Sequence, residues 1–408
     1  MPDSKQNYRW VMLILLWLVY AAIPLVGGAL GVLVTPVVND LQLTHSQMGL
    51  VLGSWQFVFI FAAIATGVII DRWGVRKSIL AGIILVVLSA GLRYLANGFA
   101  TILVAVALYG AGLPMISVGG PTAIASWFKG KRQGMALGFY MTGAWVGTLA
   151  ALSLTNSVVM PLAQNSWRVT FLYYGAVVLV VGVLWWFLAR EKKVELATKR
   201  TSPVRTLSQL IRIRNIQLLL IIGLVAQATT HGMGWLPRIL ETQGMSPAMA
   251  GYAVSANTLA GIPAVIILPG VITLGFRSRV LALAALGVAL GLGGVIGTSG
   301  ALQWASLLVM GFAGSAFLPL ILRTLMDGSG VPSEYLGSAN GVFMSVAQIG
   351  GFVAPLIVGA LHDATGAFLD GVLLLAALNL IIIPISFRLK PGSSTSDLVQ
   401  DKKQLISE

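Results

Sequence analysis

The sequence contains no cysteine, which excludes disulfide bridges, thiolate metal sites and cysteine nucleophiles. Charged residues are scarce as well: they make up 10% of the 408 residues, whereas about 25% is usual for a globular domain. Hydrophobic residues, by contrast, make up 57% of the chain. A chain with so little charge and so many apolar side chains is not a water-soluble domain of any class.

Long apolar runs, separated by short polar breaks, fill the chain. Each run is long enough for a bilayer-crossing helix, which needs about 20 residues. Lipid offers no hydrogen-bond partner to backbone groups, so the runs must be helical. The sequence therefore predicts an all-α polytopic membrane protein with twelve transmembrane helices. The runs fall at 10–36, 47–70, 78–96, 101–126, 132–157, 169–189, 216–238, 247–272, 279–298, 301–325, 336–361 and 367–388.

The charges that are present are mostly basic, with 26 Lys and Arg against 13 Asp and Glu. On a soluble chain the net charge of +13 would suggest nucleic acid. Here the basic residues gather at both termini and in the even-numbered loops, which lie on one side of the membrane if the runs alternate. This positive-inside pattern predicts a multi-pass protein of the cytoplasmic (inner) membrane with both termini cytoplasmic and no nucleic-acid partner. The first run shows no cleavage site and is expected to be a span, not a signal peptide.

The longest polar segment, 190–215, lies midway along the chain and separates two halves, 1–189 and 216–390. The later part of this linker has the spacing of a short amphipathic helix on an anionic membrane surface, although a solvated linker fits equally well. Residues 391–408 form a cytoplasmic tail in this interpretation.

The two halves repeat one another. Pro36 and Asp40 after the first run recur as Pro237 and Glu241 after the seventh, about 200 residues later. The basic loop after the second run recurs after the eighth at the same spacing. Two six-helix halves with an internal repeat are typical of alternating-access transporters, which hold their substrate near the bilayer midplane.

The loop after the second run combines small residues, an acid and fixed cations. Small residues allow a sharp turn between packed helices, and an acid beside cations makes a switchable ionic latch. The loop residues are Gly67, Asp71, Arg72, Gly74, Arg76 and Lys77. This pattern resembles the signature loop of the major facilitator superfamily, and the Arg132-Gln133-Gly134 and His362-Asp363-Ala364-Thr365-Gly366 stretches agree with it.

This resemblance implies the major facilitator fold of two pseudo-symmetric six-helix halves. It also implies a cytoplasmic latch formed by Asp71 with Arg72 and Arg132, braced against the start of the eleventh run. The second-half copy of the loop keeps only its basic end, with Ile272 and Thr273 in place of the acid and its neighbour. Within the superfamily, Leu92-Arg93, Trp127-Phe128, Gly234-Trp235-Leu236-Pro237 and Ile262-Pro263 resemble the cyanate-permease-like branch of small-anion and organic-acid porters.

Within the runs there is no convincing mid-helix acid, and the titratable candidates are His231, Arg93 and Arg323. A cavity with cationic and neutral donors suits an anion and repels a cation. His231 is the candidate for proton coupling, and the alternative is a neutral histidine hydrogen-bonded between helices. Arg93 either binds substrate or snorkels to the headgroups, and Arg323 either snorkels or contributes to the gate.

In the superfamily, spans 1, 4, 7 and 10 line the central cavity with help from 2, 5, 8 and 11. The resemblance therefore directs attention to polar and aromatic residues there, each of which can instead serve helix packing. The candidates are Tyr20, Gln56, Tyr109, Tyr140, Trp145, Gln227, Trp235, Asn257, Phe317 and Gln348.

We therefore expect a monomeric secondary transporter for a small anion or organic acid, with proton symport as one option. The alternative is an efflux transporter for a drug-like or amphipathic metabolite, although lipophilic cations would require a buried acid. Three scattered histidines and the lack of cysteine give no catalytic constellation, so we expect no enzyme, no cofactor and no metal site. The expected partners are a small-molecule substrate and the lipid bilayer.

Overall fold

The computed structural model describes residues 3–191, 213–272, 274–328 and 336–389. In these ranges the chain is helical apart from short turns and contains no strand. Twelve helical segments in the described residues are long and apolar enough to cross a membrane. This result confirms the predicted all-α fold and the number of spans. The predicted linker helix and the tail at 391–408 lie outside the described residues.

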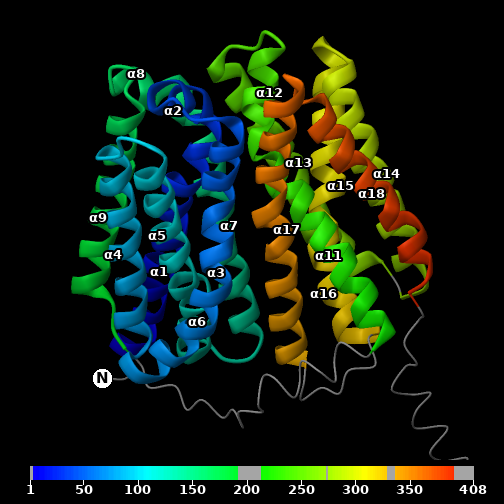
Figure 1. The fold of residues 1–408 in the computed structure, drawn as a ribbon. Helices are drawn as coiled ribbons and strands as arrows, with labels where there is room; N and C mark the ends of the chain where they lie inside the picture. Colours follow the sequence, from blue (N-terminus) through cyan, green and yellow to red (C-terminus); the bar gives the residue numbers. More distant parts are fainter. Residues whose placement is uncertain (1–2, 192–212, 273, 329–335, 390–408) are drawn as a thin grey trace, which may run out of the picture. The chain divides into compact units, whose positions relative to one another are not determined.

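The helices of the first half form six spans, several of which are built from more than one helix (Figure 1). They are α1 (Asp3–Val32) with α2 (Val34–Leu41), α3 (His45–Trp73), α4 (Val75–Tyr94), α5 (Phe99–Ser117) with α6 (Gly119–Trp127), α7 (Lys131–Leu154) with the π-helical turn η1 (Thr155–Val159) and α8 (Met160–Leu162), and α9 (Trp167–Leu188).

The second half has a matching order of elements. They are α11 (Arg214–Gly232) with η2 (Met233–Trp235) and α12 (Leu236–Thr242), α13 (Pro247–Val271), η3 (Leu274–Phe276), α14 (Arg277–Gly297), α15 (Gly300–Ser315) with α16 (Phe317–Gly328), α17 (Leu336–Thr365) and α18 (Leu369–Phe387).

Interruptions fall at corresponding places in the two halves. Span 1 breaks at Leu33 and span 7 breaks at η2, about 200 residues later. Span 4 breaks at Val118 and span 10 at Ala316, again at about that spacing. Pro114 lies one turn before the break in span 4, where its missing N–H and its ring weaken the helix. The broken spans thus follow the repeat that the sequence shows.

The chain forms two compact units. Unit 1 comprises Met1–Ala197, Gly234–Ser255 and Pro355–Gly366, and unit 2 comprises Thr198–Met233, Ala256–Ala354 and Ala367–Glu408. The short helix α12, the start of α13 and the end of α17 therefore belong to unit 1, although they come from the second half of the sequence. The predicted boundaries at 1–189 and 216–390 stay a prediction.

Small residues allow the helices to pack closely. In unit 1, α1 packs against α7 and α9, and α5 packs against α3 and α4. A Cβ atom added to Gly147 of α7 would collide with the carbonyl oxygen of Ala21, and one added to Gly110 of α5 with that of Trp55. In unit 2, a Cβ atom added to Gly350 of α17 would collide with the carbonyl oxygen of Leu224 in α11. Van der Waals packing of this kind drives helix association where lipid removes the hydrophobic effect.

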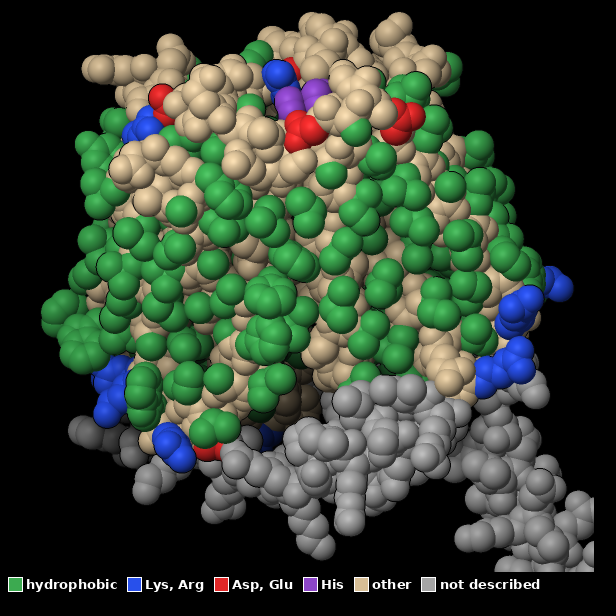
Figure 2. All heavy atoms as spheres, in the orientation of Figure 1, with side chains coloured by type: hydrophobic (Ala, Val, Ile, Leu, Met, Phe, Trp, Pro, Cys, Tyr) green, Lys and Arg blue, Asp and Glu red, His purple; other side chains and the backbone are tan. Residues whose placement is uncertain are grey.

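The surface suits a bilayer. On the face drawn in Figure 2, hydrophobic side chains cover the middle of the helices, and charged side chains gather near the helix ends. Large apolar residues such as Ile64, Phe187 and Ile266 are more than two-thirds exposed, which is stable only against lipid or another apolar surface.

Candidate functional site

A buried arginine lies inside unit 1. Arg93, in the last turn of α4, is fully buried, and its Nη1 atom donates a hydrogen bond to the carbonyl oxygen of Val26 in α1 at 2.6 Å. The guanidinium carbon lies 4.7 Å from the ring centroid of Phe171 and 5.7 Å from that of Tyr109. Arg93 therefore points inward among α1, α5 and α9, and the alternative that it snorkels to the headgroups is wrong.

The contacts of Arg93 within the described residues are a carbonyl oxygen and two aromatic faces, and its Nε atom is buried there without a hydrogen-bond partner. Cation–π contacts and one carbonyl offset only part of the cost of burying a charge. The side chain thus keeps a positive charge that an anion would stabilise.

Two tyrosines stack on one another in the same unit. The rings of Tyr20 (α1) and Tyr140 (α7) are 4.4 Å apart and nearly parallel, and the Tyr140 hydroxyl donates to the carbonyl oxygen of Ile116 at 2.9 Å. Glycines make room for these rings: a Cβ atom on Gly120 would collide with the Tyr140 hydroxyl, and one on Gly27 with that of Tyr109. The predicted residues Tyr20, Tyr109 and Tyr140 therefore lie on three helices of unit 1, namely α1, α5 and α7.

The other candidates of unit 1 have separate surroundings. Gln56 of α3 is buried, and its Oε1 atom has no hydrogen-bond partner within the described residues. Trp145 of α7 is half-buried. Trp235 is fully buried, and its Nε1 atom donates to the carbonyl oxygen of Pro355 at 2.9 Å, which ties η2 to the end of α17. Trp235 therefore serves packing where it stands, and its predicted role in binding stays a prediction.

Unit 2 contains the remaining polar candidates. The Nδ1 atom of His231 lies 3.0 Å from the carbonyl oxygen of Gln227, one turn earlier in α11. The Gln227 amide donates to the Oε1 atom of Gln348 of α17 at 3.2 Å, so the structure brings these three predicted residues onto one polar strip. Asn257 donates instead to the carbonyl oxygen of Leu307 at 2.7 Å, and Phe317 is buried at the start of α16.

The predicted latch lies at the end of unit 1 where α3 meets α4, which we call the basic end. Gly74 joins the two helices with a φ of 79°, a conformation that glycine adopts without strain. The Arg76 guanidinium donates to the carbonyl oxygen of Trp186, and its carbon lies 5.6 Å from the centroid of the Trp186 ring. These contacts fix the start of α4 to the end of α9.

The other latch residues Gly67, Asp71, Arg72, Lys77 and Arg132 are exposed. The side chains at the start of α17, against which the latch was expected to brace, lie outside the described residues. In unit 2, the Arg323 carbonyl oxygen accepts a hydrogen bond from Arg277 at 3.3 Å. The latch therefore stays a prediction.

The other end of unit 1, where α3 begins, contains polar contacts that the sequence analysis missed. We call it the opposite end. Thr35 of α2 donates to Glu241 of α12, and Arg238 donates to Thr35 at 3.2 Å. Asp40 accepts from Trp167 at 3.0 Å and pairs with Arg168. These contacts tie α2 to α12 and α9.

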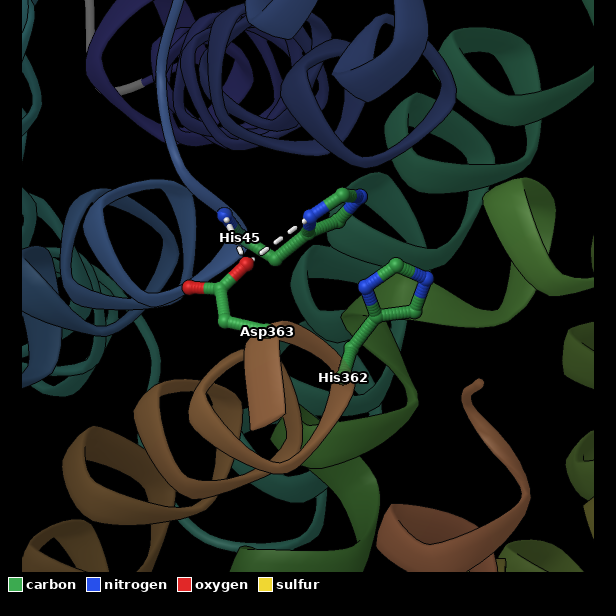
Figure 3. A group of neighbouring side chains, drawn as sticks. All are labelled: His45, His362 and Asp363. Atoms are coloured by element: carbon green, nitrogen blue, oxygen red, sulfur yellow. Dashed lines mark hydrogen bonds and ion pairs between the residues drawn. The ribbon is translucent and has the colours of Figure 1, made fainter. Parts of the chain in front are cut away.

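A group of two histidines and one aspartate completes the opposite end. The rings of His45 (α3) and His362 (α17) are 3.7 Å apart between centroids, and the His45 Nδ1 atom lies 3.1 Å from Asp363 Oδ1 (Figure 3). Figure 2 shows histidines at the surface beside acidic and basic side chains. Counting the spans puts the start of the second and the end of the eleventh on one side of a membrane, which is the only signal of this group in the sequence.

Relatives with curated names cover nearly the whole chain. The chain is 24% identical to the probable galactarate/D-glucarate transporter GudP of Bacillus subtilis, over 98% of this chain and 96% of that protein. It is 23% identical to the hexuronate transporter of Bacillus subtilis, over 86% of each chain. Identity with the D-galactonate transporter of Escherichia coli is 22%, over 92% of this chain and 95% of that protein.

Solved structures show the same fold. The D-xylose–proton symporter matches with a TM-score of 0.75 and 16% identity, over 94% of this chain and 97% of that chain. A bacterial homologue of the human lysosomal transporter Spinster, in an inward-facing and unoccupied conformation, matches with a TM-score of 0.74 and 16% identity, over 93% and 95% of the two chains.

The twelve spans, their interruptions and these matches define a multi-pass membrane transporter for a small molecule, not an enzyme. The chain belongs to the Major Facilitator Superfamily, which residues 16–355 match. The family and fold predicted from the signature loop are thereby confirmed. The relatives above are named for sugar acids, and the resemblance to the cyanate-permease-like branch stays a prediction, as does symport.

Proposed function

We propose that the protein carries a small organic anion, specifically a sugar acid, across the cytoplasmic membrane by alternating access. The single observation that carries this proposal is the buried positive charge of Arg93, whose contacts in the described residues include no acid. The relatives named for galactarate, hexuronate and galactonate support a substrate of this class.

A sugar acid combines a carboxylate with several hydroxyl groups. A guanidinium group binds a carboxylate through charge-assisted hydrogen bonds, which are about twice as strong as neutral ones. Tyrosine hydroxyls and amide groups hydrogen-bond sugar hydroxyls within an otherwise apolar pocket. In this proposal Arg93 attracts the anion, and Tyr20 and Tyr109 orient it.

The interrupted helices support alternating access. Spans 1 and 7, and spans 4 and 10, break at corresponding positions, and paired interruptions of this kind accompany binding sites in transporters built from repeats. The broken turns free backbone groups that a substrate can satisfy. We assign the basic end to the cytoplasm by the positive-inside rule, which places the opposite end outside and both termini inside.

His231 is the candidate for proton coupling. Its ring lies on the polar strip with Gln227 and Gln348, and imidazole is the side chain that takes up a proton near neutral pH. A proton bound there would travel with the anion and offset its charge.

Counterflow tests the proposal. The purified protein is placed in liposomes loaded with unlabelled D-glucarate, and uptake of labelled D-glucarate is measured with competitors outside. We expect saturable uptake that galactarate, galactonate and glucuronate inhibit and that D-xylose does not. Cyanate is included because of the predicted branch. Faster exchange of neutral sugars than of sugar acids would overturn the anion assignment, and exchange of lipophilic cations would favour the efflux alternative.

Variants of Arg93 test whether its positive charge contributes to binding of the sugar acid. Arg93→Gln removes a charged hydrogen-bond donor, a change worth about 1.5–3 kcal/mol, so kcat/KM for glucarate should fall by about tenfold or more. Arg93→Lys keeps the charge and serves as the matched control, with a smaller loss. Equal kcat/KM values for the Gln variant and the wild type would remove Arg93 from the binding site.

A further inference from the structure

We propose that His45, His362 and Asp363 form a binding site for a divalent transition-metal ion, with Zn²⁺ as the best fit, which joins α3 to α17 at the opposite end of unit 1. The three histidines are scattered along the chain, so the sequence alone indicates no metal site. The fold brings two of them together with an acid.

The distances suit a small ion. One ligand atom from each residue lies within 4.8 Å of the other two, and the His45 Nδ1 to Asp363 Oδ1 distance is 3.1 Å. Ligand atoms about 2.1 Å from a tetrahedral zinc ion are about 3.4 Å apart. One pair, at 3.1 Å, is close to that separation, and small rotations of the half-buried rings would bring in the third ligand.

The ligand types select the metal. Two imidazole nitrogens and one carboxylate oxygen are a known zinc set, which leaves the fourth position for water. Calcium and magnesium prefer oxygen ligands and are disfavoured by two histidines. The His45 and Asp363 side chains are 21% and 30% exposed, so an ion can enter from solvent.

The carboxylate is held in place before an ion binds. Asp363 Oδ1 accepts the backbone N–H of His45 at 2.9 Å (Figure 3). Oδ2 accepts the backbone N–H of Ser46 at 2.7 Å and also the Ser46 hydroxyl. Both lone pairs of Oδ2 are therefore occupied, whereas Oδ1 has one lone pair that faces His45 Nδ1 and that a metal ion would take. Such outer contacts orient ligands and strengthen metal sites. Arg238, whose charge acts on His362, is itself paired with Glu241 at 3.8 Å, which reduces its repulsion of a metal ion.

An ion at this site would cross-link two spans from different halves of the sequence. His45 opens span 2, and His362 and Asp363 close span 11. The consequence for transport rests on the proposed function: alternating access requires the outer ends of these spans to separate, so bound Zn²⁺ would inhibit transport, and a chelator would restore it.

Direct binding is measured first, on the full-length protein in detergent with any affinity tag removed. We expect one Zn²⁺ per chain by calorimetry and visible absorption bands from Co²⁺ in a site of low coordination number. His362→Gln and His45→Ala should each weaken binding at least tenfold, while His231→Ala, which removes the histidine outside the group, should not. His362→Gln retains the bonds from Asp363 to α3, so its folding is not at risk.

Counterflow with Zn²⁺ then separates this site from the proposed function. Metal binding without any sugar-acid transport would overturn the proposed function and leave the site intact. Transport without stoichiometric Zn²⁺ binding would overturn the site, as would full Zn²⁺ binding by the double variant His45→Ala and His362→Ala. Inhibition of the wild type that EDTA reverses and that His362→Gln abolishes would support both.

Discussion

The carboxylate of Asp363, near the end of α17, caps the first turn of α3 by accepting the backbone N–H groups of His45 and Ser46 at 2.9 and 2.7 Å. Thr44 and Gln47 form a capping box on the same helix, with bonds of 3.0 and 3.1 Å. Four N–H groups at a helix start lack partners in the helix, and here one residue from a distant part of the sequence, Asp363, supplies two acceptors. The part of the stabilisation that Asp363 adds to the start of α3 therefore lasts only while the end of α17 stays beside it.

The first prediction follows from this cap. Asp363→Ala removes both acceptors and the charge that favours a helix N-terminus, so it should lower the free energy of unfolding by about 1 kcal/mol. Asp363→Asn keeps one oxygen and should lose less. Thermal unfolding in detergent measures the difference, and equal melting temperatures for wild type and Asp363→Ala would show that the cap adds no stability.

The fold was predictable because membrane physics leaves few choices. Lipid forces each apolar run to be helical, and the run length fixes the number of spans. Span ends were less certain: the run predicted at 78–96 is the helix Val75–Tyr94, since the basic residues Arg76 and Lys77 belong to its first turn. A hydropathy pattern does not detect the polar turn by which a helix extends beyond its apolar residues.

The surroundings of individual side chains were harder to predict. The position of Arg93 near a helix end fits both snorkelling and burial, and only the packing of Val26 and Phe171 from other helices decides between them. His45 and His362 looked scattered because the sequence gives no distance between spans 2 and 11. Such contacts depend on tertiary packing, which hydrophobic periodicity does not encode.

The second prediction concerns the cost of burying Arg93. Burying a charge without a counter-ion is costly, and replacing buried ionic groups by apolar side chains of similar volume is often neutral or stabilising. Arg93→Met should therefore keep or raise the melting temperature and yet abolish sugar-acid counterflow. A large drop in melting temperature would instead show that the guanidinium is a structural group held by Val26, Phe171 and Tyr109.

The third prediction tests close helix packing. Gly110→Val places side-chain atoms against the backbone of Trp55 and should destabilise the protein by about 1–3 kcal/mol. Gly138→Val is the matched control, because a Cβ atom there meets nothing within 4 Å. Melting temperatures in detergent report both variants. Equal values would mean that α3 and α5 can move apart without cost.

The fourth prediction concerns His231. If its protonation accompanies the anion, net uptake by the wild type should rise as the outside pH falls through the imidazole range, since the protonated form is then more populated. His231→Gln keeps hydrogen-bonding capacity without titrating near neutral pH and should flatten that profile. Uptake is measured in liposomes from pH 5.5 to 8. A variant that retains the wild-type profile would exclude His231 from coupling.

The last prediction uses the absence of cysteine, because a single introduced cysteine is then a unique label. Leu52 of α3 is 8% exposed and lies 3.9 Å from the Cβ position of Gly234, so Leu52→Cys should react with an impermeant maleimide only when α3 and η2 separate. Asp71→Asn weakens the proposed latch at the basic end. An ion pair worth about 1 kcal/mol shifts a two-state ratio about fivefold, so labelling and transport should both fall by about that factor. Asp71→Glu keeps the charge and should restore both. Unchanged labelling with Asp71→Asn would show that this acid does not control the equilibrium.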